Sequence, residues 1–199
     1  MKFVVSNILC KGFVMCRGYI TPGDVYNYAP EDSYVDSKFT QIFYLIEGTA
    51  GLIKCDGEYI ASYNNGALDV IPEYKDYFDN HFDYVPQSST MMLDVRTFQG
   101  KAFNFEAGSQ GGTWLCINPI PATKHFDAKI LKPNTHTTIV GDGKEHVIIC
   151  AKGKITARQG EKSDTPERIL NQFNYVRVLN DKVVNIAIPG DSEALYLTR

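Results

Sequence analysis

The sequence predicts an all-β protein built from two similar units. Most of its apolar runs are short, rich in β-branched and aromatic residues, and closed by a turn signal, which is typical of strands. Long stretches with helical periodicity are absent. One pattern also occurs twice, about a hundred residues apart. These three observations favour a duplicated β unit over a mixed or helical fold.

Nine runs are expected to form strands, because each combines strand-forming residues with a following turn signal. In chain order they are residues 13–15, 42–46, 67–71, 91–95, 113–117, 147–151, 175–179, 183–188 and 194–197. The first ten residues hold one Lys and no small-residue cleavage site, which predicts a strand and not a signal peptide. The only predicted helix start is 165–171, a single turn with Thr165 as N-cap and Pro166 in the first position.

The repeated pattern predicts two β-hairpins that are built alike. Each copy is an apolar run, a charged residue with Gly, a second strand-like run, and a Gly-Glu pair. The copies are 42–46, Glu47-Gly48, 52–55 and Gly57-Glu58, and then 147–151, Lys152-Gly153, 154–157 and Gly160-Glu161. We therefore expect an N-terminal unit over 1–100, a Gly-rich linker over 101–112 and a C-terminal unit over 113–199.

Composition excludes several classes of protein. With 44% hydrophobic and 22% charged residues the chain is predicted to be globular, and no apolar run is long enough for a membrane span. Five cysteines without a CxxC pair favour reduced thiols and a cytoplasmic location, or a particle assembled in the cytoplasm. No basic cluster is dense enough to predict nucleic-acid binding.

The charge is distributed unevenly between the two halves. Residues 1–100 carry 7 Lys/Arg and 13 Asp/Glu, a net −6, whereas residues 101–199 carry 13 and 10, a net +3. Opposite halves can attract each other within one chain or head to tail between copies.

The run Phe43-Tyr44-Leu45-Ile46-Glu47-Gly48, with the strands that follow it, resembles the first hairpin of the cupin superfamily. The resemblance covers residues 39–78 and, less closely, 130–160. It implies a bicupin, in which two jelly-roll barrels lie together and their mouths hold a metal and a small substrate.

The metal ligands that the resemblance implies are missing from both copies. That family uses two His one residue apart, a Glu and a third His, a set suited to redox or Lewis-acid chemistry. In the first copy Gln41 stands in the Glu position, and residues 34–37 stand where the His pair belongs. Tyr77 lies near the position of the third His, which this chain lacks. In the second copy His146 stands in the Glu position and 139–141 replace the pair. We therefore expect neither a metal nor another cofactor.

Two histidines remain as candidate catalytic residues. His146 is either an acid/base in a barrel mouth or a hydrogen-bonded His at a strand start. Its neighbour Glu145 should point to the opposite face of the strand. His81 is a candidate acid/base for a metal-free sugar isomerase or epimerase, activities that the family resemblance implies.

Residues 69–84 hold five carboxylates and five aromatic rings. They are interpreted as a contact surface for a basic partner, as a sugar-binding rim, or as an exposed loop whose rings turn into the barrel. The candidate partner- or ligand-binding residues are Asp69, Glu73, Tyr74, Asp76, Tyr77, Asp79, Phe82 and Asp83.

The expected function is a non-catalytic cupin-like module that binds copies of itself or another protein, as a homo-oligomeric structural subunit, for example of a virus particle. The alternative is a metal-independent enzyme or binder for a sugar or sugar nucleotide, with His146 or His81 as the acid/base.

Overall fold

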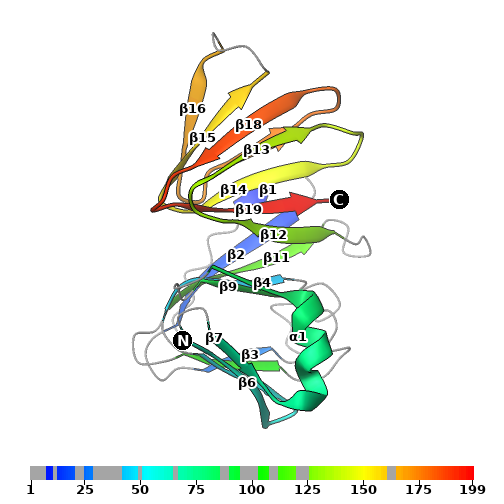
Figure 1. Ribbon diagram of the computed structural model, residues 1–199, viewed down its shortest axis with the longest axis vertical. Helices are drawn as coiled ribbons and strands as arrows, with labels where there is room; N and C mark the ends of the chain where they lie inside the picture. The colour runs from blue at the N-terminus through cyan, green and yellow to red at the C-terminus, as the bar shows by residue number, and fades with distance from the viewer. Residues whose placement is uncertain are drawn as a thin grey trace. The chain divides into compact units, whose positions relative to one another are not determined.

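A computed structural model describes residues 8–10, 13–20, 25–28, 42–48, 51–64, 67–85, 90–94, 103–107, 112–119, 126–160 and 165–199. These residues form antiparallel strands and one short α-helix, so the all-β prediction is confirmed. Each of the nine predicted runs overlaps a strand, although Ile71 and Leu179 lie just beyond the ends of theirs and Val95 lies outside the described residues. The chain divides into two compact units, Met1–Thr123 and Lys124–Arg199 (Figure 1). No helix among the described residues is long and apolar enough to cross a membrane.

The first unit contains two antiparallel sheets. One has the strand order Ile8–Cys10 (β1), Phe13–Ile20 (β2), Gly112–Pro119 (β11), Ile42–Gly48 (β4), Met91–Asp94 (β9) and Phe82–Tyr84 (β8). The other has the order Val25–Tyr28 (β3), Phe103–Ala107 (β10), Gly51–Cys55 (β5), Glu58–Asn64 (β6) and Ala67–Val70 (β7). Pro72–Tyr74 (η1) and Lys75–His81 (α1) run from the edge strand β7 of one sheet to the edge strand β8 of the other.

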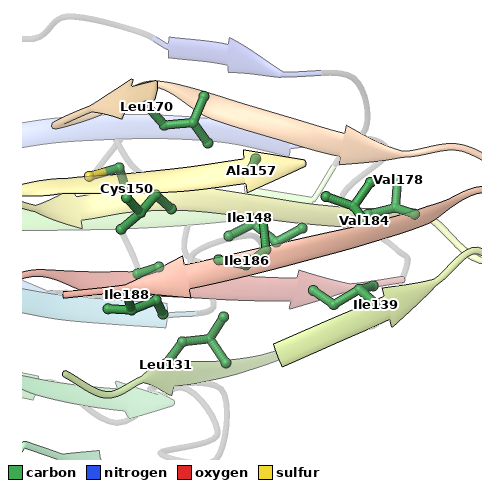
Figure 2. Packing of buried hydrophobic residues seen from close by; sticks show 12 residues of the cluster. Leu131, Ile139, Ile148, Cys150, Ala157, Leu170, Val178, Val184, Ile186 and Ile188 are labelled. Atoms are coloured by element: carbon green, nitrogen blue, oxygen red, sulfur yellow. The ribbon is translucent and has the colours of Figure 1, made fainter. Parts of the chain in front are cut away.

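The second unit also contains two sheets. One has the order Asp127–Leu131 (β12), Glu193–Thr198 (β19), His146–Lys152 (β14) and Tyr175–Val178 (β17). The other has the order Thr135–Val140 (β13), Val183–Ile188 (β18), Lys154–Gln159 (β15) and Glu167–Asn171 (β16). Side chains from both sheets fill the space between them, and Figure 2 shows Ile148, Leu170 and Ile186 among them. Alternate residues of each strand supply this core, as a two-residue period requires.

The prediction of two hairpins at Glu47-Gly48 and Lys152-Gly153 is wrong. The strands before and after each pair belong to different sheets, β4 and β5 in the first unit and β14 and β15 in the second. The chain therefore turns a corner between sheets at both places. The hairpin lies one turn later, where Asp56 and Gly57 adopt φ of 51° and 87° between β5 and β6, as a type I′ turn requires.

Two further predictions need correction. The expected linker over 101–112 contains β10, which pairs with β3 and β5, and β11 pairs with β2 and β4. The boundary between units therefore falls between Thr123 and Lys124. In the predicted helix start at 165–171, residues Glu167–Asn171 form strand β16 instead, because Leu170 is buried in the core and the strand pairs with β15 along its length.

Candidate functional site

The aromatic rings of segment 69–84 lie in the core of the first unit. Phe78 of α1 is 1% exposed, and the half-buried rings of Tyr74, Tyr77 and Phe82 pack against the same cluster. Phe82 also meets Tyr63 of β6 edge to face, with 5.4 Å between ring centroids. Three of the eight candidate binding residues therefore serve packing between the two sheets.

The carboxylates of the same segment stay at the surface. Glu73, Asp76 and Asp79 are exposed, and Asp79 forms an ion pair with Lys75 one helical turn away at 2.8 Å. Asp83 is half-buried and accepts a hydrogen bond from the backbone N–H of Tyr84. These acids are spread along η1, α1 and β8 and do not converge on one point. His81 ends α1, and its side chain lies outside the described part of the structure.

Asp69 lies in a groove on the outer face of the five-stranded sheet. The groove has a volume of about 460 Å³, and Leu52, Tyr59, Ile71 and Ser62 are among the other lining residues. Leu52, Ser62 and Asp69 stand side by side on three neighbouring strands, β5, β6 and β7. The groove is therefore an apolar depression with a carboxylate on one side.

A β-bulge shapes this groove. The pairing between β5 and β6 shifts between Ile53 and Lys54, so Ile60 and Ala61 are both buried while Tyr59 is 51% exposed. Such bulges re-aim side chains and bend the strand. Simple alternation places Tyr59 on the same face as the buried Tyr63, and for this reason sequence reasoning missed it as a groove residue.

Polar contacts hold the Tyr59 ring at the edge of the groove. The Tyr59 hydroxyl donates to Glu106 of β10 at 3.1 Å, and the Lys54 ammonium lies 4.1 Å from the centre of the Tyr59 ring and 3.5 Å from the same carboxylate. The hydrogen bond with Tyr59 raises the pKa of Lys54 above its ordinary value.

His146 lies on the inner side of the second unit, at the start of β14. It is 5% exposed, and both ring nitrogens have partners: Nδ1 lies 2.6 Å from the Tyr196 hydroxyl and Nε2 lies 2.8 Å from the Asp142 carboxylate. A carboxylate accepts, so the Nε2–H of His146 donates to Asp142, and in this tautomer Nδ1 accepts from the Tyr196 hydroxyl. The hydrogen bond from His146, with that from the Lys144 N–H, lowers the pKa of Asp142.

Lys129 lies next to this cluster. It is the cross-strand neighbour of Tyr196 in β12 and β19, and its ammonium lies 5.2 Å from the centre of the Tyr196 ring. Because both nitrogens of His146 are occupied, the groups that can meet a ligand first are the Lys129 ammonium and the exposed Asp142 carboxylate. Asp142 was visible in the sequence only as part of a Gly-Asp-Gly turn, and Tyr196 only as a strand residue.

Glu145 points away from His146, as strand alternation predicts. Its carboxylate forms ion pairs with Arg199 and, at 4.0 Å, with Arg177, and its backbone pairs with that of Arg199. Glu145 therefore holds the end of β19 in place and does not join His146 in one site.

The second unit does not fit the metal site of the family that the sequence resembles. At the expected ligand positions Ile139 is buried in the core and Val140 is an exposed apolar residue. Nowhere in the described residues do three His, Cys, Asp or Glu side chains gather closely enough to hold a metal ion. In the first unit Tyr77 packs against the core, and positions 34–37 and 41 lie outside the described residues.

Several solved structures share this architecture. A conserved protein of unknown function from Pseudomonas aeruginosa PAO1 has a TM-score of 0.58 at 7% identity, over 94% of this chain and 80% of that one. YhaK from Escherichia coli has a TM-score of 0.53 at 9% identity, over 98% and 91%. Oxalate decarboxylase from Lactobacillus farciminis, in a formate complex, has 0.51 at 10% identity, over 97% and 76%. No protein-family model and no curated protein matches the sequence.

Proposed function

The chain has the cupin fold, and we propose that it is a non-catalytic bicupin-like module that acts by assembly, as a homo-oligomeric structural subunit. A virus particle is one setting in which such a subunit serves. The proposal concerns the surfaces of the two units and not a reaction inside them.

The observation that carries this proposal is the filling of both interiors. In the first unit Tyr63, Phe78 and Met91 are each at most 1% exposed and belong to one apolar cluster. In the second unit Ile148 and Ile155 are fully buried in another. A barrel that holds a substrate needs a cavity with converging polar groups, whereas the described residues of these sheets turn apolar side chains into the space between them. The groove near Asp69 lies on an outer face instead.

Size-exclusion chromatography with light scattering tests the proposal. We expect a defined multimer whose mass does not depend on the flow rate or on modest changes in concentration. Because unlike charges contribute to the contact, raising the salt concentration should weaken the multimer. A single chain at every concentration would contradict self-assembly.

A second candidate function is favoured by the cluster at His146. Lys129, Tyr196 and Asp142 offer a cation, a hydroxyl and a carboxylate at one end of the second unit, a set that suits the phosphates and hydroxyls of a sugar nucleotide. In this function His146 orients Tyr196, because both ring nitrogens are already bonded. His81 belongs to the first unit, so it remains a candidate acid/base for a site in that unit and not for the cluster at His146.

Thermal unfolding with uridine diphosphate glucose tests this second candidate. A ligand present at about a hundred times its dissociation constant should stabilise the chain by about 2.7 kcal/mol. Lys129→Ala should abolish the shift, whereas Lys182→Ala, at another exposed site of the same unit, should keep it. The absence of a shift in the unchanged protein would count against this function.

A further inference from the structure

We propose that copies of this chain bind head to tail: the groove over β5, β6 and β7 of one copy receives the outer face of β15 and β16 of the next. This inference rests on the proposed assembly function and names the two surfaces through which assembly occurs. Two exposed patches of opposite charge, one on each unit, lead to it.

The first patch is the groove that contains Asp69. Its rim exposes three large apolar side chains, Leu52 at 36%, Tyr59 at 51% and Ile71 at 39%. Monomeric proteins expose single apolar residues routinely, but a gathered set around a depression marks an interaction site. The Asp69 carboxylate is exposed, and no described residue forms an ion pair with it. The groove therefore suits an apolar side chain that is accompanied by a cation.

The second patch lies on the outer face of the sheet formed by β13, β18, β15 and β16. Ile169 of β16 is 62% exposed, the most exposed large apolar side chain in the described part of the chain. Its direct cross-strand neighbour is Thr156, and Lys154 and Arg158 follow on the same face of β15, two residues to either side. Ile169 is therefore an apolar side chain flanked by two cations.

Arg158 is incompletely paired within the chain. Among the described residues its ion-pair partner is Glu167, whose carboxylate lies 3.9 Å from Nη1, beyond a good charge-assisted hydrogen bond. Its Nε–H is buried and has no acceptor among the described residues. The Arg158 side chain is 33% exposed, so its Nη donors can reach a second carboxylate, and Asp69 of a second copy supplies one.

The charge of the whole units agrees with this pairing. Residues 1–123 hold 8 Lys/Arg and 14 Asp/Glu, a net −6, and residues 124–199 hold 12 and 9, a net +3. The first unit of one copy and the second unit of another therefore attract each other, whereas like units repel. Because the two patches differ, the contact is heterologous, and the defined multimer expected above is a ring closed by such contacts.

Two single variants test the proposal, since each blocks one patch. Asp69→Arg places a cation in the groove, and Ile169→Asp removes the apolar side chain and sets a carboxylate beside Arg158. Both positions are exposed, so both variants should fold, which circular dichroism verifies. Each should raise the dissociation constant by about a hundredfold or more, and light scattering should then find single chains.

Mixing the two variants gives the sharpest result. The Asp69→Arg chain keeps an intact second patch and the Ile169→Asp chain keeps an intact groove, so an equimolar mixture should form a complex of two chains and no larger species. Matched controls are Asp76→Arg on α1, outside the groove, and Val140→Asp on β13, at the opposite edge of the sheet that carries Ile169. Both controls should keep the mass of the unchanged protein.

The outcomes separate the two proposals. If the unchanged protein is a multimer and Asp69→Arg and Ile169→Asp leave its mass unaltered, the head-to-tail contact is wrong while assembly stands. A mixture that stays at the mass of single chains also overturns the contact. If the unchanged protein is itself a single chain at all concentrations, both proposals are overturned.

Discussion

The Tyr196 hydroxyl of β19 lies 2.6 Å from Nδ1 of His146 in β14, and their two rings are nearly parallel, at 7°. Between these strands Tyr196 is directly paired with Ile148, and His146 with Thr198, so the contact is a diagonal one on the inner face. A buried polar side chain is thus satisfied by a residue 50 positions away in sequence, and this bond joins two neighbouring strands of one sheet.

Tyr196→Phe should destabilise the second unit. It removes the donor to His146, which is 5% exposed, and a buried polar atom without a partner costs about 1–3 kcal/mol. Urea unfolding followed by far-UV circular dichroism measures the loss. Tyr59→Phe is the matched control, because its hydrogen bond to Glu106 is exposed and should contribute only about 0.5 kcal/mol. Equal effects of the two variants would contradict the role of His146.

Asp142→Asn should make stability less sensitive to acid. The pKa of Asp142 is lowered in the folded chain, chiefly by its hydrogen bond with His146. The group therefore stabilises the fold above its unfolded pKa, near pH 4, and this contribution is lost as pH falls through the lower folded value. Unfolding midpoints measured from pH 6 down to about pH 3 should fall less steeply in the variant. Asp127→Asn, an exposed acid of the same unit, should retain the slope of the unchanged protein.

Gly153→Ala should destabilise the corner between β14 and β15. Gly153 has φ of +67°, and an added Cβ would meet Ser192 Oγ and lie 2.9 Å from the Asp191 carbonyl oxygen. Backbone strain contributes about 1–2 kcal/mol, and the clash adds to it because Ser192 is 1% exposed and accepts a hydrogen bond from the Lys154 N–H. The measurement is the denaturant concentration at the midpoint of unfolding, compared between Gly153→Ala and the control Gly143→Ala. Gly143 has φ of +90° and free space around it, so only the strain should appear there.

Phe78→Ala and Asp79→Ala should differ in their effect on stability, because segment 69–84 buries its aromatic rings and exposes most of its carboxylates. Phe78 is 1% exposed in the core, and its truncation should lower the free energy of unfolding by about 3–5 kcal/mol. The neighbouring Asp79 forms only an exposed ion pair with Lys75, whose loss should cost at most about 1 kcal/mol. Thermal unfolding of both variants distinguishes these effects, and a mild effect of Phe78→Ala would mean that the ring is not in the core.

Local patterns in the chain were sufficient to predict the all-β class and nine of the strands, but not β10, which was expected as linker, or β16, which was expected as a helix start. The repeat at Glu47-Gly48 and Lys152-Gly153 marks equivalent positions in the two units, a corner in each. Its nature as a corner was not predictable, because a strand carries no local signal that says with which other strand it pairs. Helix α1 was missed for a related reason: its seven residues are held by the burial of Phe78 and not by a periodic pattern or a side-chain cap.

The candidate sites divide in the same way, into features that local sequence predicts and features that contacts between distant residues decide. Sequence alone singled out Asp69 and His146 and predicted that Glu145 and His146 face opposite ways, since side-chain alternation is a property of the strand itself. Only the tertiary structure decided that Tyr77 and Phe82 turn inward, that Tyr59 turns outward at a bulge, and that Tyr196 reaches His146. Those outcomes depend on contacts between residues far apart in the chain, and the free energy of such contacts exists only once the sheets have come together.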